Sequence, residues 1–268
     1  MERSNDGILD TSSESFKKKR SNDGSPYKSL KKKQKTNYYD IQEKFKCPIF
    51  YFDKSLLIKD FLEDFSKIIC VTGPSKHGKT VNLIMMRYFF EMNYEDKNNR
   101  KNRELFENLE IAKEVKNDKR YIDLYQSQYP VVYIDFNEIV INDSYQKTIN
   151  TFKKFIKKLY KNYEKIIIKN LSEDEKITWN NFINLNIDFD DLINSISFLC
   201  KSLKEELGKQ IILLIDNYDS PLLNSVNTDF YDNFYFFYKK IFEKIFNKNE
   251  SYLFKTFITG KINVCFFN

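Results

Sequence analysis

The chain is short of three residue types: its 268 residues include six glycines, four cysteines and a single histidine. With His77 as the sole histidine, a metal or acid–base site built on imidazoles is not expected. No C-x-x-C pair occurs among Cys47, Cys70, Cys200 and Cys265. Because Cys70 falls in an expected strand and Cys200 in an expected helix, we expect reduced thiols in the core of an intracellular protein.

Long apolar stretches are also missing. No run of about 18 apolar residues occurs, so neither a membrane span nor a membrane partner is expected. The polar N-terminus has no apolar signal-peptide core, which argues against secretion by that route. The hydrophobic fraction of 41% is enough for a sizeable core, either in one large α/β domain with a tail or in two small domains.

Two of the six glycines stand five positions apart in the octet GPSKHGKT, residues 73–80. This octet fits the phosphate-binding pattern G-x-x-x-x-G-K-[ST] at every fixed position. In that pattern the glycines let backbone N–H groups surround a phosphate, the lysine reaches the β- and γ-phosphates, and the threonine hydroxyl binds Mg²⁺. The residues expected to hold the nucleotide are therefore Gly73, Pro74, Ser75, Lys76, His77, Gly78, Lys79 and Thr80.

The segments on either side of the octet suit this interpretation. Residues 67–72 (KIICVT) are a short run of β-formers, typical of a buried parallel strand, and residues 81–91 are long and apolar enough for a helix. The alternative is a Gly-Lys turn between two ordinary elements. It explains the match less well, because a chance match is rarer in so glycine-poor a chain.

The remaining chain alternates between expected helices and expected strands. Gly208 stands where a helix C-cap favours glycine. We expect strands at 130–136, 210–216 and 253–260, and helices at 52–63, 145–170, 189–207 and 230–246, with polar segments at 93–128 and around Trp179. Strands separated by helices indicate an α/β fold with a three-layer parallel sheet of the P-loop NTPase type.

The strand at 210–216 carries a second piece of chemistry. Its five apolar residues run into Asp216, which is typical of a Walker-B strand whose carboxylate holds nucleotide-bound Mg²⁺. Ligands collect at the carboxyl edge of such sheets, so we expect Lys79, Thr80 and Asp216 together there, with Thr80 and Asp216 as metal ligands. Thr259 ends the last expected strand at the same edge. It either senses the γ-phosphate or simply terminates the strand.

Five segments, in order along the chain, resemble the AAA-ATPase-like family. They are 50–58 (FYFDKSLLI), 78–80 (GKT), 129–133 (YPVVY), 215–222 (IDNYDSPL) and 258–260 (ITG). The resemblance implies a P-loop ATPase core with ATP and Mg²⁺ as cofactors, which in many members precedes a PD-(D/E)xK nuclease-like domain. No lysine and carboxylate set in a strand context restores such a nuclease site here.

One position departs from the family pattern. Members usually read D-E-Y-D where this chain reads DNYD at residues 216–219. The glutamate would polarise the attacking water, whereas the amide of Asn217 can orient water but cannot take its proton, a loss of about 10²–10⁴-fold in rate. Asp219 either substitutes for this base or caps the loop or helix that follows. The catalytic candidates are Lys79, Asp216, Asn217 and Thr259.

The length of the sequence is the second departure. If the strands follow the order usual for ATPases with a catalytic acid, the sequence ends just after the sensor strand. We therefore expect residues 47–268 to form a P-loop domain whose sheet is incomplete at its C-terminal end. Self-association stays open as well, because the arginine that many ATPases borrow from a neighbour is not located.

Residues 1–46 are expected to be a disordered basic tail. The first 37 residues hold ten Lys/Arg against five Asp/Glu and almost no apolar side chains, too few to bury a core. Two basic clusters within residues 17–35 are spaced like a bipartite nuclear-import signal. Both a nuclear and a cytoplasmic location stay open, and the tail's partner is an import receptor or nucleic acid if it has one.

Three functions remain in competition. An Mg-ATP-binding protein with slow or switch-like hydrolysis is preferred, since the binding half of the site is complete. The alternatives are a catalytically inactive nucleotide-binding or interaction module and a nuclear protein whose tail contacts nucleic acid. A GTPase is disfavoured, because residues 247–250 (NKNE) end in Glu rather than in the Asp of the guanine-reading N-K-x-D pattern.

Overall fold

The computed structural model describes residues 52–95, 102–167, 171–246, 251–264 and 266. Contacts divide the chain into two units, Met1–Ile49 and Phe50–Asn268, and all described residues lie in the second. The expected tail at 1–46, its basic clusters at 17–35 and the NKNE segment at 247–250 lie outside the described residues. The expectations attached to these segments therefore stay predictions.

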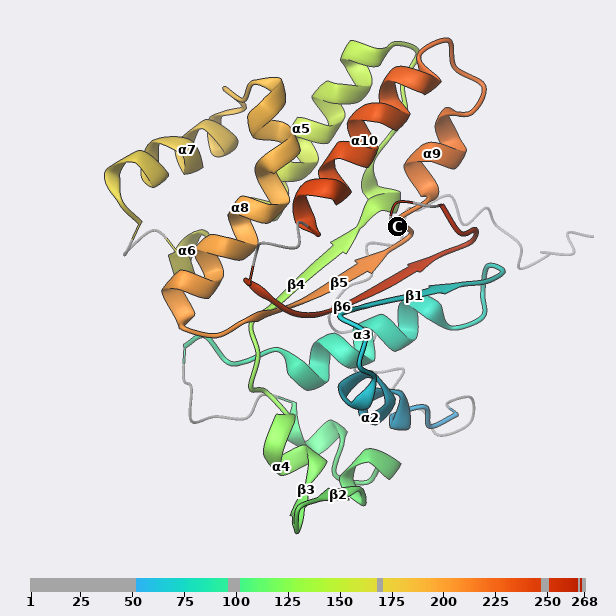
Figure 1. The fold of residues 1–268 in the computed structure, drawn as a ribbon, viewed down its shortest axis with the longest axis vertical. Coiled ribbons are helices and arrows are strands. Elements are labelled where there is room, and N and C mark those ends of the chain that lie inside the picture. The colour runs from blue at the N-terminus through green and yellow to red at the C-terminus, as the bar shows by residue number, and fades with distance from the viewer. Residues whose placement is uncertain (1–51, 96–101, 168–170, 247–250, 265, 267–268) are drawn as a thin grey trace, which may run out of the picture. The chain divides into compact units, whose positions relative to one another are not determined.

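Four parallel strands form the central sheet, in the order β1–β6–β5–β4 (Figure 1). Their bounds are β1 (Ile68–Thr72), β4 (Val131–Asp135), β5 (Ile211–Asp216) and β6 (Leu253–Gly260). The register pairs Val71 with Thr259 and Asp135 with Asp216. Because parallel strands end at the same edge of a sheet, three polar side chains, those of Asp135, Asp216 and Thr259, collect at one edge.

Helices cover the sheet on both sides (Figure 1). Helix α3 packs against β4, β5 and β6 with α2 on its side of the sheet, and α5, α8 and α10 lie on the other side. The helices are α2 (Leu56–Glu63), α3 (Lys79–Phe90), α4 (Tyr121–Tyr125), α5 (Tyr145–Lys161), α6 (Glu164–Ile167), α7 (Glu173–Asn184), α8 (Phe189–Leu207), α9 (Ser220–Ser225) and α10 (Tyr231–Ile245). The expected α/β class with a parallel sheet is confirmed.

Helix α8 shows why the sequence signals worked where they did. Its N-terminus is capped by the Asp188 side chain, which accepts a hydrogen bond from the backbone N–H of Asp191 at 2.7 Å. Its C-terminus is closed by Gly208 in the left-handed conformation, at φ +65°. Both caps are local, so the predicted bounds 189–207 agree with the helix as it stands.

The core between the sheet and α10 is rich in aromatic rings. Phe136 begins the short helix η3 (Phe136–Glu138) after β4, and its ring lies 5.3 Å from that of Tyr238 and 5.7 Å from that of Phe242. The buried hydroxyl of Tyr238 donates to the backbone carbonyl of Tyr218 at 2.8 Å, so this phenol has the polar partner that burial requires. Helix α10 is thereby fixed to the segment that follows β5.

Strand β1 lies at the edge of the described sheet, and this position corrects two expectations. The apolar run predicts a buried strand, but the last three residues of β1 are exposed. Cys70 is one of them, so the prediction of a core thiol is wrong there, whereas Cys200 on α8 is fully buried as expected. The place of a strand in its sheet decides its burial, and a local apolar run does not report that place. Cys47 and Cys265 lie outside the described residues.

The polar link expected around Trp179 is a helix, α7. Ser172 accepts a hydrogen bond from the N–H of Glu175, and the Glu175 carboxylate accepts one from the N–H of Ser172, a reciprocal capping box. Trp179 is buried and its ring lies 4.6 Å from that of Tyr160 on α5. The S-x-x-E spacing was a readable signal for this helix. The helix expected over 145–170 is divided into α5 and α6, and residues 168–170 lie outside the described part.

The polar segment expected over 93–128 contains a small lobe of short elements. It consists of two 3-10 turns, an antiparallel hairpin and a short helix. In chain order these are η1 (Arg103–Leu105), η2 (Glu110–Ala112), β2 (Val115–Lys116), β3 (Lys119–Arg120) and α4. Each element is only two to five residues long, which is too short for hydrophobic periodicity to reveal it.

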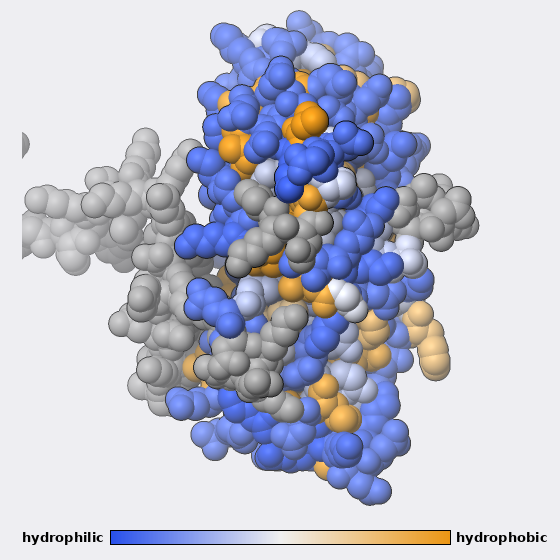
Figure 2. Space-filling model, turned by 90° about the vertical axis from the view of Figure 1, so that its left-hand side faces the viewer, coloured by the Kyte–Doolittle hydropathy of each residue, from blue (hydrophilic) through white to orange (hydrophobic). Residues whose placement is uncertain are grey.

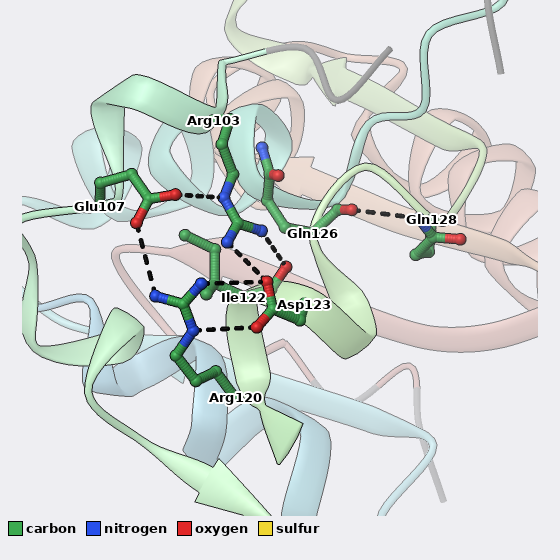
Figure 3. Close-up of polar contacts among 7 residues, drawn as sticks. All are labelled: Arg103, Glu107, Arg120, Ile122, Asp123, Gln126 and Gln128. Atoms are coloured by element: carbon green, nitrogen blue, oxygen red, sulfur yellow. Dashed lines mark hydrogen bonds and ion pairs between the residues drawn. The ribbon is translucent and has the colours of Figure 1, made fainter. Parts of the chain in front are cut away.

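Charged side chains hold this lobe together (Figure 3). Arg103 donates to Glu107 at 2.5 Å, to Asp123 at 2.6 Å and to the backbone carbonyl of Ile122 at 2.9 Å. Arg120 donates to Asp123 at 2.9 Å and lies 3.7 Å from Glu107. We call Arg103, Glu107, Arg120 and Asp123 the arginine cluster. Each of its carboxylates contacts both guanidinium groups.

The outer surface carries few large apolar areas on the face shown in Figure 2. That face is mainly hydrophilic, and its hydrophobic side chains stand in small separate groups. Among the helices of the described residues, none has both the length and the apolar character that crossing a membrane requires.

Candidate functional site

Residues 73–80, here called the glycine loop, connect β1 to α3 and include the first two residues of that helix. Gly78 is the N-cap of α3 and has φ +82°, a left-handed conformation that glycine adopts without strain. Lys76 is also left-handed, at φ +68°. At the start of the loop, the N–H of Gly73 donates to the carbonyl of Gly260 at 3.1 Å, which joins the loop to the end of β6. The glycine loop is therefore attached to the sheet edge that carries Asp216 and Thr259.

The Lys79 side chain lies across its own loop. Its ammonium donates to the backbone carbonyls of Gly73 at 2.6 Å and Pro74 at 2.7 Å. His77 points elsewhere, since its Nδ1 lies 3.0 Å from the carbonyl oxygen of Ser75. Neutral carbonyls are weaker partners for an ammonium than an anion is. Lys79 is thus held in place by groups that a charged oxygen would displace.

A pocket of about 270 Å³ opens beside the loop. It is lined by Ser75, Lys76, Gly78, Lys79, Thr80, Val81, Asn217 and Lys261. Three of these residues are lysines and none is acidic. The N-terminus of α3 adds its unpaired N–H groups and the positive end of its dipole. Charge and geometry together favour a ligand with several negative charges.

A fourth lysine approaches the loop from the segment before α2. The Nζ atom of Lys54 lies 4.0 Å from the position that a Cβ on Gly78 would take. The neighbouring side chains explain its placement: Asp53 accepts from the N–H of Glu110 at 2.8 Å, and Ser55 accepts from the N–H of Ile111 at 3.0 Å. These bonds tie the FYFDKSLLI block to η2. Sequence reasoning took the block as a family signature and as the start of a helix at 52–63, whereas α2 begins at Leu56.

Asp216 sits at the end of β5 with its carboxylate fully buried. Its Oδ1 accepts from the hydroxyl of Thr259 at 2.5 Å and from the N–H of Asn217 at 3.0 Å. Its Oδ2 has no hydrogen-bond partner in the described part of the chain. A buried carboxylate oxygen without a partner is costly and calls for a cation or a water molecule bound to one. Thr259 reaches the expected edge, where it contacts Asp216 and does not line the pocket.

The amide of Asn217 connects the pocket to a carboxylate that sequence reasoning missed. Its Nδ2 donates to Oδ1 of Asp135 at 2.9 Å, and the same oxygen accepts from the N–H of Asn137 at 3.0 Å. Burial raises the pKa of the Asp135 carboxyl, and the Asn217 amide opposes the rise. The signal for Asp135 was present: it is the last residue but one of the expected strand at 130–136, whose apolar residues lead into it much as those of 210–216 lead into Asp216.

The carboxylate of Asp219 makes contacts that neither of the two roles suggested by the sequence includes. Its Oδ2 accepts hydrogen bonds from the N–H groups of Lys261 at 2.7 Å and Ile262 at 2.8 Å. No side-chain bond from Asp219 caps α9, which follows it. Gly260 is packed tightly here, because a Cβ on it would lie 2.6 Å from the Tyr218 ring and 2.9 Å from Oδ1 of Asp219. The buried carboxylate therefore fixes the chain just after β6.

The structure brings most of the expected site residues together. Five of the eight expected nucleotide-binding residues line the pocket, namely Ser75, Lys76, Gly78, Lys79 and Thr80. Gly73 and Pro74 contribute carbonyls that hold Lys79, and His77 lies outside the lining. Of the catalytic candidates, Lys79 and Asn217 line the pocket, and Asp216 with Thr259 lies behind Asn217.

Comparison with known proteins shows to which family the chain belongs. One family model, AAA-ATPase_like, with the description "Predicted AAA-ATPase", matches residues 11–266. No curated protein and no solved structure matches the chain. The family match spans nearly the whole sequence and agrees with the resemblance carried by the five motif segments. The chain therefore belongs to the AAA-ATPase-like family, a family of predicted ATPases.

Proposed function

We propose that this protein binds ATP with Mg²⁺ in the pocket at the N-terminus of α3 and hydrolyses it slowly, as a switch. The observation that carries the proposal is the lysine-lined pocket without a carboxylate, formed by a loop that fits the phosphate-binding pattern. Family membership supports nucleotide binding in general. The parallel sheet with helices on both sides supports a three-layer domain of the P-loop NTPase type.

The residues present fit a Mg²⁺–nucleotide complex. The backbone N–H groups of the glycine loop and the Lys79 ammonium bind the phosphates, with Lys79 leaving the carbonyls of Gly73 and Pro74. The Thr80 hydroxyl and the unpartnered Oδ2 of Asp216 hold the cation. When bound, Mg²⁺ neutralises charge on the β- and γ-phosphates.

The side chains beside the pocket explain why hydrolysis is slow. The Asn217 amide orients a water molecule through its oxygen while its Nδ2 stays on Asp135. An amide accepts no proton, so Asn217 cannot serve as the general base for this water molecule, and the attack of the water is slow. Thr259 keeps Oδ1 of Asp216 occupied, which leaves Oδ2 as the oxygen available to the cation. ATP is therefore retained longer than it would be with a glutamate at position 217.

One observation favours a second candidate, a nucleotide-binding module without catalysis. The only carboxylate in contact with the Asn217 side chain in the described residues is Asp135, and it is turned to Asn217 and Asn137. If the Asp135 carboxylate takes no proton from an attacking water molecule, the protein binds ATP as a structural or regulatory ligand without hydrolysing it. A nuclear location and a nucleic-acid contact through residues 17–35 remain separate predictions.

The test is ATP binding and ATP hydrolysis on one preparation of the full chain. We expect Mg²⁺-dependent binding in the wild type and a loss of about 100-fold or more in affinity in Lys79→Ala, since an ammonium on phosphate is lost. Lys154→Ala, which removes an exposed lysine on α5, is the matched control and should bind normally. Equal affinity in Lys79→Ala and wild type would reject the proposal. Phosphate release above background separates the slow ATPase from the inactive module.

A further inference from the structure

Lys261 is a pocket residue that the phosphate-binding pattern does not contain. It is the first residue after β6, and it lines the pocket together with residues of the glycine loop and Asn217. The structure gives its ammonium no ion pair and no hydrogen bond within the described part of the chain. Three lysines and the positive end of α3 share one pocket whose lining holds no acid, so an anion bound there would reduce the mutual repulsion of these charges.

The backbone that carries Lys261 is held firmly. Asp219 is 1% exposed, and its carboxylate accepts from two consecutive N–H groups, those of Lys261 and Ile262. The Tyr218 hydroxyl donates to the carbonyl of Ile262 at 3.0 Å and accepts from the N–H of Val264 at 2.7 Å. The side chain at 261 is exposed, but its Cα position is fixed by buried groups. This is how a binding side chain is mounted on a rigid support.

Lys261 contributes to the side of the pocket that follows the ends of β5 and β6. The glycine loop and Lys79 form one wall, and Asn217 and Lys261 form another, at the ends of β5 and β6. Asn217 directly follows Asp216, the residue that would hold the cation of a Mg²⁺–nucleotide complex through its unpartnered Oδ2. A terminal phosphate bound to that cation would therefore lie within reach of groups beside Asn217.

We propose that Lys261 binds the terminal phosphate and makes the pocket distinguish ATP from ADP, with Asp219 as the residue that positions it. The inference rests on the proposed function, because it assigns a selectivity to the same pocket. A lysine delivers a compact point charge on a flexible stem, which suits a group that is present in one nucleotide and absent from the other. The positive charge that meets the terminal phosphate is then the ammonium of this lysine, which directly follows β6 in the chain.

The test compares ATP and ADP affinities in the presence of Mg²⁺ for the full chain. We expect Lys261→Ala to weaken ATP binding about tenfold with ADP binding unchanged, and Lys261→Arg to restore the preference for ATP. Because Lys261 is exposed, these variants should fold, and Lys154→Ala again serves as the matched control. An unchanged ratio of ATP to ADP affinity in Lys261→Ala would overturn the inference.

Asp219 is tested through the same ratio. Asp219→Asn keeps an acceptor but loses its charge, so we expect a smaller drop in ATP preference, and no further drop when it is combined with Lys261→Ala. If Asp219→Asn lowers ATP and ADP affinity equally, its role is structural and the positioning assignment is wrong. The outcomes remain distinct from those of the proposed function. If Lys79→Ala binds as wild type, the pocket assignment fails; if Lys79→Ala loses both nucleotides and Lys261→Ala keeps the wild-type ratio, only the inference fails.

Discussion

Charged side chains are arranged in opposite ways in the pocket and in the arginine cluster. At the pocket, cations and acids are separated. Lys76, Lys79 and Lys261 line the hollow, while Asp135 and Asp216 stand at the strand ends and bond to an amide and a hydroxyl. In the arginine cluster cations and acids are mixed, and each carboxylate contacts both guanidinium groups (Figure 3).

The difference separates charge that stabilises the fold from charge that is available to a ligand. Opposite charges in the arginine cluster pair with one another, so the cluster joins η1 to β3 and α4. Its charges are used within the fold and not for binding a ligand. Like charges that stand together repel one another, and this repulsion is relieved only when a ligand of opposite charge binds. Phosphates would relieve it for the lysines, and a cation would relieve it for the acids. Sites that bind ligands commonly carry such a stability cost. Substitutions of charged groups at the pocket should therefore change ATP binding or turnover, and substitutions in the arginine cluster should change the stability of the fold.

The largest effect is expected from swapping the amide and the acid beside the pocket. Asn217→Glu combined with Asp135→Asn keeps the amide–carboxylate contact but puts the carboxylate at the pocket wall. We expect ATP turnover to rise about 100-fold, the lower end of what general-base catalysis contributes. In Asn217→Glu alone, a second carboxylate takes the place of the amide that now donates to Asp135 Oδ1 at 2.9 Å. The two carboxylates repel each other, so this variant should be less active than the double variant. Steady-state phosphate release measures both.

The Asp135→Asn single variant is the control for the swap. It removes the acid without adding one at 217, so its turnover should not exceed that of the wild type. If the double variant is no faster than Asp135→Asn, a missing base at position 217 does not limit hydrolysis. The inactive-module interpretation would then gain support.

The next effect is expected on stability, from breaking the arginine cluster. The Arg103 side chain is 20% exposed and donates to two carboxylates and a backbone carbonyl, so Arg103→Ala should lower the free energy of unfolding by about 2 kcal/mol. Arg103→Lys keeps the charge but not the planar fork and should be intermediate. ATP affinity should be unchanged in both. Denaturant unfolding measures the loss of stability, and ATP titration measures the affinity. A loss of ATP affinity would contradict the idea that the arginine cluster serves the fold and not the pocket.

The sequence revealed the site better than it revealed the lobe beside it. The glycine loop, β5 with Asp216 and β6 with Thr259 are each encoded in one short segment, and the parallel sheet brings their ends together. The arginine cluster depends on contacts between η1, β3 and α4, elements of two to five residues that no period discloses.

Long-range contacts also account for what sequence reasoning missed within the site. Asp219 bonds to N–H groups that lie 42 and 43 positions away in the chain, so no local pattern could separate this role from helix capping. The exposure of Cys70 follows from the strand order, which places β1 at the edge of the described sheet. Local caps and strand ends were readable, and groups that act across the fold were not.

A smaller effect is expected when a pocket lysine is removed in the absence of nucleotide. Lys261→Ala takes one unpaired cation away from Lys76 and Lys79, so the melting temperature should stay the same or rise by about 1 °C. With saturating ATP the order should reverse, because the wild type binds the ligand more tightly and gains more stability from it. A clear fall in the melting temperature without nucleotide would mean that Lys261 contributes to the fold, as Arg103 does. Thermal scans with and without ATP measure both signs.

The smallest effect concerns the pH dependence of stability at Asp135. Burial raises the pKa of this carboxyl above its ordinary value of 3.8, so the folded state binds more protons than the unfolded state between the two values. Its contribution to stability is therefore lost as the pH rises through this window. Asp135→Asn keeps an oxygen acceptor for the Asn217 amide and removes the titration. We expect the variant to be slightly more stable than the wild type at about pH 7, with the difference shrinking toward about pH 4. If the wild type is the more stable protein at neutral pH, the ionised carboxylate is better satisfied than its burial implies, and the acids of the site, like those of the arginine cluster, contribute to the fold.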